Sequence, residues 1–106
     1  MPDLLEKQPQ ESRLYDMDFS PKMVQGVAPE AIASVDSVTQ LELLADGTRV
    51  ATTDLTFPSS ATFALQVAQQ RIEAGVTEKT YVVTYVVTTD LGNILEAEGL
   101  LLVVDR

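Results

Sequence analysis

Two pairs of closely spaced acids are the strongest candidates in this chain for binding a metal ion. Asp16 and Asp18 are separated by one residue, and Glu96 and Glu98 repeat that spacing. On a β-strand such residues share a face about 7 Å apart, so each pair could contact a divalent cation. Calcium takes about six to eight oxygen ligands, and the next acid before Asp16 is Glu11. We therefore expect solvated or hydrogen-bonded strand acids, with no metal site and no cofactor.

Catalytic side chains of the usual kinds are missing from the composition. The chain contains neither histidine nor cysteine, so the commonest general base, zinc ligand and thiol nucleophile are absent, as is any disulfide framework. Its serines and threonines have no histidine to activate them. The five glycines are isolated from one another, which excludes a glycine-rich phosphate cradle. These features predict a binding or structural protein and no enzyme.

The charge balance argues against two classes of partner. The formal net charge is −9, from 16 acids and 7 bases, and the bases are scattered among the acids. Nucleic acids and anionic membranes attract clustered lysine and arginine, so neither is an expected partner. No apolar run approaches the roughly 18 residues of a membrane span. The acidic start, "MPDLLEKQPQES", lacks the basic and apolar regions of a secretion signal.

Almost all of the predicted secondary structure is β-strand, including the segments that carry the paired acids. At 106 residues the chain has room for one domain. Apolar and polar residues alternate within several segments bounded by Gly, Pro, Asn and Asp, as in the strands of an antiparallel sandwich or small barrel. The expected strands cover residues 12–21, 30–44, 49–58, 59–67, 80–89 and 94–105. We expect about seven strands in one domain, residues 12–106, preceded by an extended N-terminal arm, residues 1–11.

Local signals refine this picture. Parity changes near Ser37 predict a bulge in the strand 30–44, and "ADGT" predicts a two-residue hairpin loop. Residues 69–79 are expected to form a loop or short turn, although a helix competes over 64–74. Strand parity places nine side chains in the core: Phe63, Leu65, Val67, Tyr81, Val83, Tyr85, Leu95, Leu101 and Val103.

Tyr81 stands at the entry to the penultimate strand. A β-sandwich often places a tyrosine corner there, with the hydroxyl bonded to nearby backbone. The predicted fold class is therefore all-β, a single antiparallel immunoglobulin-like β-sandwich. The antibody hallmarks, a cysteine pair and a tryptophan, are absent.

The final strand stops alternating halfway along. Its second face reads Ile94, Glu96, Glu98 and then Leu100, Leu102 and Val104. If the last three face outward, they form an apolar patch of the kind found at interfaces. The alternative is that both faces are buried in one sandwich because the N-terminal segment folds across this strand. In the arm, Leu4 and Leu5 form an isolated apolar pair that could reach a neighbour or belong to a frayed end.

The order of these segments resembles a known family. "LYDMDFSP", "EAIASVDSV", "ATFALQV" and "TYVVTYVVTTDLGNILEAEGLLLVVD" occur in the order seen in small virion proteins of tailed bacteriophages. This family is described as fiber-tail adaptor or neck-associated proteins with an immunoglobulin-like fold. The resemblance covers residues 12–106; the segment "AQQRIEAGVTEKT" is longer and more charged than the family's short turn.

The resemblance implies a non-enzymatic structural role in a phage particle, as an adaptor between neck, tail or tail-fiber components. Its implied partners are other virion proteins and repeated copies of itself in a symmetric assembly, made in the cytoplasm of an infected bacterium. The alternatives are a capsid cement or decoration protein and a cellular immunoglobulin-like binding module. In each phage interpretation we expect Leu4, Leu5, Leu100, Leu102 and Val104 to lie at contacts between chains.

Overall fold

The chain folds into β-strands arranged in two sheets. The computed structural model describes residues 3–7, 12–23 and 29–104, and of these the side chains of residues 3–7 and 13 are left undescribed. The described residues form nine strands and one 3₁₀ helix: β1 (Asp3–Lys7), β2 (Arg13–Asp18), η1 (Ser20–Lys22), β3 (Ile32–Leu43), β4 (Arg49–Ala51), β5 (Leu55–Thr56), β6 (Thr62–Ala64), β7 (Val67–Ala74), β8 (Thr80–Thr89) and β9 (Ile94–Val103). The predicted all-β class is confirmed.

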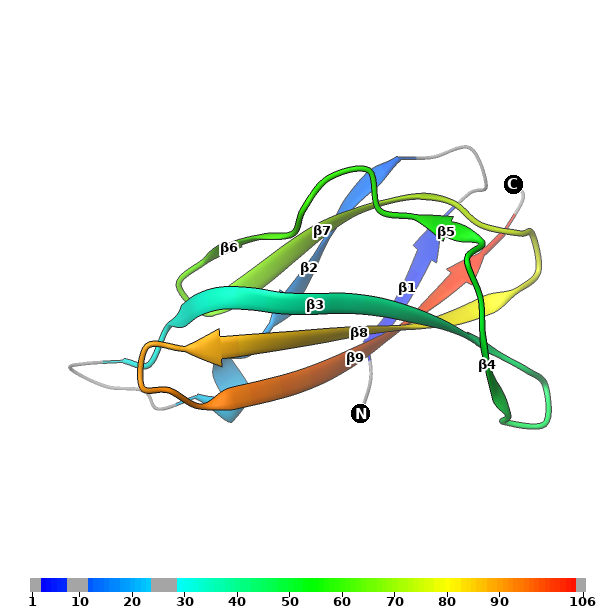
Figure 1. The fold of residues 1–106 in the computed structure, drawn as a ribbon. Helices are drawn as coiled ribbons and strands as arrows, with labels where there is room; N and C mark the ends of the chain where they lie inside the picture. Colours follow the sequence, from blue (N-terminus) through cyan, green and yellow to red (C-terminus); the bar gives the residue numbers. More distant parts are fainter. Residues whose placement is uncertain (1–2, 8–11, 24–28, 105–106) are drawn as a thin grey trace.

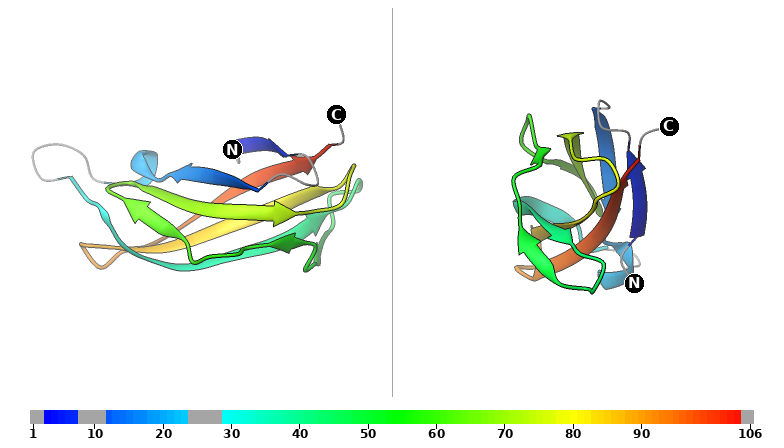
Figure 2. Two further views of the ribbon diagram at one scale, coloured as in Figure 1. Left: turned by 90° about the horizontal axis from the view of Figure 1, so that it is seen from above. Right: turned by 90° about the vertical axis from the view of Figure 1, so that its right-hand side faces the viewer.

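The two sheets face each other as a sandwich. One sheet has the order β1-β9-β8-β3-β4, and the other has β2-β7-β5 with β6 also paired to β7. Figure 1 shows β3, β8 and β9 side by side, with β2 and β7 in the second layer, and Figure 2 shows the layers from two further sides. The molecule is elongated, 44 × 27 × 21 Å. Its long axis separates two ends, one formed by the β8–β9 turn and the other by the β3–β4 hairpin (Figure 1).

The N-terminal segment contributes a strand to this fold. β1 falls within the predicted arm and pairs in parallel with β9, with Leu4 opposite Leu100 and Leu5 opposite Leu101. The other pairings among the described strands are antiparallel. The rest of the arm, residues 1–2 and 8–11, lies outside the described residues.

The β8–β9 hairpin supplies the centre of the core. Valine, tyrosine and threonine dominate β8, and these residues fit a pleated, buried surface better than a helix. Its inward positions Tyr81, Val83 and Tyr85 are at most 1% exposed, and Leu101 and Val103 on β9 are fully buried. The predicted core positions on this hairpin are confirmed, with Leu95 packed against the core but only partly buried.

The segment before that hairpin differs from the prediction. Phe63 is 43% exposed and Leu65 is 79% exposed, so their assignment to the core is wrong, and Val67 is only half-buried. The reason is a reversal of the chain: β6 ends at Ala64, and Leu65, with φ +54°, turns it into β7. Both exposed side chains therefore lie near the end of the sandwich instead of between the sheets.

Residues 67–74 form the central strand of the second sheet, so the predicted loop over residues 69–79 is wrong for its first half. β7 pairs with β2, β5 and β6. Ala68 and Ile72 point into the core, and the residue between them on that face is Gln70. The buried Gln70 amide donates hydrogen bonds to the carbonyls of Ser59 and Arg71, both at 2.9 Å. A satisfied polar residue at an inward position hides the apolar alternation that identifies a strand.

The sequence also predicted a bulge in β3 and a tight turn after it, and both are present, although the turn is one residue longer than predicted. The register between β3 and β8 shifts between Val35 and Ser37, which confirms the predicted bulge near Ser37. The turn after β3 has three loop residues instead of the predicted two, since the Leu44 N–H donates to the Thr48 carbonyl at 2.8 Å. Gly47 closes this turn with φ +89°, a conformation that glycine adopts without steric cost.

Candidate protein-docking face

The paired acids are bonded within the protein. Asp16 accepts a hydrogen bond from the Gln69 amide at 2.9 Å, and Asp18 accepts one from the Ser20 N–H at 2.9 Å. Glu98 pairs with Arg49, while Glu96 is exposed opposite Val86. Over the part of the chain that the structure describes, no three His, Cys, Asp or Glu side chains come close enough to hold a metal.

The outer face of the five-stranded sheet is the face turned away from the second sheet. On β9, Leu100 lies opposite Val82 and Leu102 opposite Thr80, while their neighbours in sequence face the core. Leu100, Leu102 and Val104 are each half-buried. These three predicted site residues therefore share the outer side of one strand, beside the positions of Leu4 and Leu5 in β1.

An apolar row crosses this outer face. The pairings place four apolar residues side by side: Ala51 (β4), Leu41 (β3), Val82 (β8) and Leu100 (β9). The backbone of Leu4 in β1 continues this register next to Leu100. An outward position in a two-layer sandwich normally faces water and is polar. A continuous apolar row across four strands is therefore a surface suited to another protein.

An ion pair lies across the middle of the apolar row. Arg49 Nη1 is 2.9 Å from Glu98 Oε1, and the two side chains join β4 to β9 over the two strands between them. In the strand register, Arg49 lies in the same row as Thr80 of β8, and Glu98 lies in the same row as Thr84. The ion pair therefore passes over β8 at Val82, halfway between these two rows.

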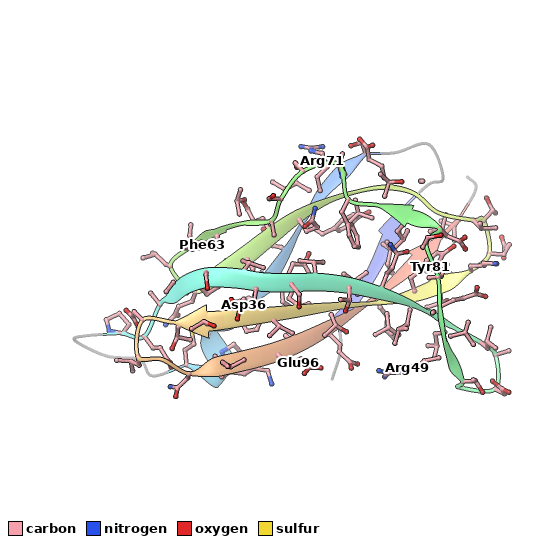
Figure 3. All side chains as sticks on the ribbon, in the orientation of Figure 1. Asp36, Arg49, Phe63, Arg71, Tyr81 and Glu96 are labelled. Atoms are coloured by element: carbon pink, nitrogen blue, oxygen red, sulfur yellow. The ribbon has the colours of Figure 1, made fainter. Side chains whose placement is uncertain are left out.

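This crossing explains why Val82 has no exposed area on an outward face. The hydrogen bond and charge of Glu98 raise the pKa of Arg49. Figure 3 shows Arg49 and Glu96 on the same side of the sheet. Since the ion pair is in contact with solvent, it is weak, and a partner could displace it.

The tyrosine corner predicted at Tyr81 is present. The Tyr81 hydroxyl accepts a hydrogen bond from the Val76 N–H at 3.0 Å and donates one to Asp54 at 2.9 Å. Lys79 Nζ lies 3.2 Å from Glu42 and 3.6 Å from Asp54. This polar cluster closes the end of the sandwich opposite the β8–β9 turn and fixes the start of β8.

A second set of exposed apolar residues lies at the β8–β9 end and was absent from the predicted site. It contains Phe63, Leu65, Leu91 and Ile94. The signal that could have found it is Leu91, a large apolar residue inside the polar turn sequence "DLGN". Leu65 could not have been found this way, because strand parity assigns it to the core.

The fold and these surfaces define a small β-sandwich whose notable features are apolar contact surfaces. A family model described as "Podophage GP4 fiber-tail adaptor protein gp77" matches residues 7–102 of the chain, and the chain belongs to this family. The resemblance to phage fiber-tail adaptors is thereby confirmed. The protein is a structural component of a phage tail, and so of the virion.

Two further comparisons complete this picture. Neither a curated protein nor a solved structure matches the chain. None of the helices in the described residues has the length and apolar character needed to cross a membrane.

Proposed function

We propose that this chain bridges tail and fiber proteins through the outer face of its five-stranded sheet, in repeated copies related by the symmetry of the tail. The role is structural and involves no catalysis, metal or cofactor. Of the predicted contact residues, we assign Leu100, Leu102 and Val104, with the position of Leu4 beside them, to this face. Leu5 stands opposite the core-facing Leu101, so its position belongs to the other face of the sheet. The observation that carries the proposal is the apolar row, because it runs across β4, β3, β8 and β9 on a sheet face that would otherwise face water.

The energetics support a contact made in many copies. Complete burial of a leucine side chain contributes about 1.5–3 kcal/mol. Leu100 and Leu102 are already half-buried in the isolated chain, so each gains only part of that amount. One such contact is modest, but copies that bind together in a symmetric particle reinforce one another.

The strand arrangement supports an immunoglobulin-like sandwich. The two sheets of such a fold contain the neighbouring strands B-E-D and G-F-C, with strand A beside B, and a tyrosine corner lies near the start of strand F. Here β2-β7-β5 and β9-β8-β3 occupy those places, and Tyr81 begins β8. We also propose that the chain is made in the cytoplasm of the infected bacterium before it enters the particle.

The proposal is tested by replacing both leucines with aspartate, Leu100→Asp and Leu102→Asp together. We expect a folded, monodisperse chain that fails to enter particles, because a partner cannot bury two carboxylates. A milder pair, Leu100→Thr and Leu102→Thr, introduces uncharged β-branched residues that suit a strand and should reduce entry less. Incorporation is measured by quantitative mass spectrometry of purified particles, which also gives the number of copies relative to fibers and capsid subunits.

Leu14→Asp is the control. Leu14 is 47% exposed on β2 in the other sheet, so this change adds one carboxylate away from the docking face and should leave incorporation unchanged. Two results would contradict the proposal. One is normal incorporation of the double aspartate variant. The other is that even the threonine pair leaves the isolated chain unfolded, since those leucines would then belong to the core of the monomer.

A further inference from the structure

The end of the sandwich formed by the β6–β7 and β8–β9 turns presents large apolar side chains to water. Leu65 is 79% exposed, Ile94 71%, Leu91 61% and Phe63 43%. The three highest values among the exposed large apolar residues of the described chain all occur here. Figure 1 shows the two turns at the same end of the molecule, and Figure 3 places Phe63 there. We call Phe63, Leu65, Leu91 and Ile94 the loop-end cluster.

Backbone contacts bring these turns together. The Ile32 N–H donates to the carbonyl of Leu65 in the β6–β7 turn at 2.7 Å. The carbonyl of Ala31, which precedes Ile32, accepts a hydrogen bond from the N–H of Asp90 in the β8–β9 turn at 2.9 Å. The two turns therefore flank the same dipeptide, so Leu65 and Leu91 belong to neighbouring turns at this end of the sandwich. Ile94 adjoins them, since it begins β9 directly after the second turn.

A buried carboxylate fixes this arrangement. Glu30 is 2% exposed, and its Oε2 accepts hydrogen bonds from Thr89 Oγ1 at 2.5 Å and from Asn93 Nδ2 at 2.8 Å. Its backbone carbonyl accepts one from Gln66 Nε2 at 2.8 Å. One residue thus bonds to both turns of the loop-end cluster. Surfaces held in place before binding lose less conformational entropy when a partner docks.

Leu65 sits in an unfavourable backbone conformation. Its φ of +54° belongs to the left-handed region, where glycine, asparagine and aspartate are the usual residues. A leucine at this position costs conformational energy and also exposes apolar surface, so neither local folding nor solubility explains it. Strained residues of this kind gather at binding surfaces, where the side chain has a use.

The charges around the loop-end cluster indicate the partner. Asp36 accepts a hydrogen bond from Thr88, the residue opposite Ile94, and Asp90 and Glu96 lie on either side of Ile94 in sequence. These three acids are exposed, and one base, Lys22 in η1, lies at the same end. An apolar surface with an acidic border complements an apolar recess bordered by lysine and arginine.

We propose that the loop-end cluster is a second docking site, for a different protein of the particle whose contact surface is such a basic-bordered apolar recess. This inference rests on the proposed function, since an adaptor must hold two proteins at once. Ile94 and Leu100 are six residues apart on β9, about 20 Å, so one partner can occupy the apolar row while another occupies the loop-end cluster.

Photo-cross-linking in intact particles tests the site directly. A photoreactive phenylalanine analogue is placed at position 65, 91 or 14 of the full chain, with position 14 as the exposed control in the other sheet. We expect positions 65 and 91, and not 14, to cross-link to a particle protein other than this chain, at peptides that contain lysine or arginine. Cross-links to copies of this chain only, or yields no higher than at position 14, would overturn the inference.

A paired variant separates binding from folding. Leu65→Asn suits the positive φ and removes the apolar side chain, so the melting temperature of the isolated chain should stay level or rise. In particles, the cross-link from position 91 should fall roughly tenfold or more, the effect of losing one anchor of a contact. An unchanged cross-link yield with Leu65→Asn would overturn the inference.

The two proposals fail in different ways. If the wild-type chain is missing from purified particles, both fall. If the chain enters particles and depends on Leu100 and Leu102, but positions 65 and 91 cross-link no more than position 14, the proposed function stands and only the second docking site is wrong.

Discussion

The hydroxyl of Tyr81 connects three parts of the chain. It bonds to the Val76 N–H before β8 and to Asp54 before β5, although the side chain itself lies in the core. Burial raises the pKa of Tyr81 to about 12, and the neighbouring Asp54 carboxylate adds to the shift, while the hydrogen bond from Val76 opposes it. Because its hydroxyl has a partner on each side, this tyrosine can be buried without an unsatisfied polar group.

This shift predicts a loss of stability in alkali. The folded-state pKa of Tyr81 lies above its value of about 10 in the unfolded chain, so folding favours the protonated form. The contribution is complete below pH 10 and disappears as the pH rises from about 10 to about 12, a loss on the order of 2 kcal/mol. Urea unfolding at a series of pH values should show this decline.

Tyr81→Phe provides the comparison. The variant should lose about 1 kcal/mol at neutral pH, because Val76 and Asp54 lose their partner, and it should then decline less steeply than the wild type above pH 10. Lys79, whose pKa is raised mainly by its hydrogen bond to Glu42, titrates in both proteins. The difference between the two profiles therefore reports on Tyr81, and parallel profiles would contradict its assigned pKa.

At the scale of elements, the final hairpin was predictable and the segment before it was not. β8 is rich in β-branched and aromatic residues, and the first half of β9 alternates between apolar and polar residues, so the fold class and the core face of this hairpin follow from the sequence alone. β7 is composed largely of good helix formers and carries Gln70 at a core position. Its identity as a strand depends on pairing with β2, β5 and β6, which are distant in sequence and so invisible to local patterns.

The candidate site shows the same division. The outward parity of Leu100, Leu102 and Val104 can be read along one strand. Their extension into a row with Leu41 and Val82 requires the register between strands, which no single segment contains. The placement of β1 beside β9 is another long-range pairing, and it brings Leu4 opposite Leu100. Long-range register is therefore the information that local sequence patterns lack.

The corner between β7 and β8 predicts a sharp difference between two glycines. Gly75 has φ +104°, and a Cβ there would lie 2.8 Å from Val103 Cγ2 and 3.1 Å from Leu55 Cδ2. Gly75→Ala should cost about 1–2 kcal/mol for the left-handed backbone and about 1–3 kcal/mol more for overpacking the core. The cost is measured as the change in free energy of unfolding in urea.

Gly47→Ala is the matched control for this prediction. Gly47 has φ +89°, but a Cβ at this position meets nothing within 4 Å. It should therefore show only the backbone cost, about 1–2 kcal/mol. Equal costs for the two variants would mean that the chain does not pack against Gly75 as described.

The layout of the whole molecule fits the proposed bridging role. It is 44 Å long, with the apolar row on one sheet face and the loop-end cluster at one end. A net charge of −9 keeps separate copies apart in solution and favours partners with basic surfaces. In the proposed arrangement we expect hydrophobic contacts to supply the affinity and the acids to guide the choice of partner.

The most direct test of the bridging role is a cryo-electron microscopy reconstruction of the phage tail that contains this chain. We predict repeated copies at the junction of tail and fibers, each with Leu100 and Leu102 buried against one protein and Leu65 and Leu91 buried against a different one. Copies on the capsid shell, or copies at the junction whose β9 outer face is open to solvent, would contradict this account.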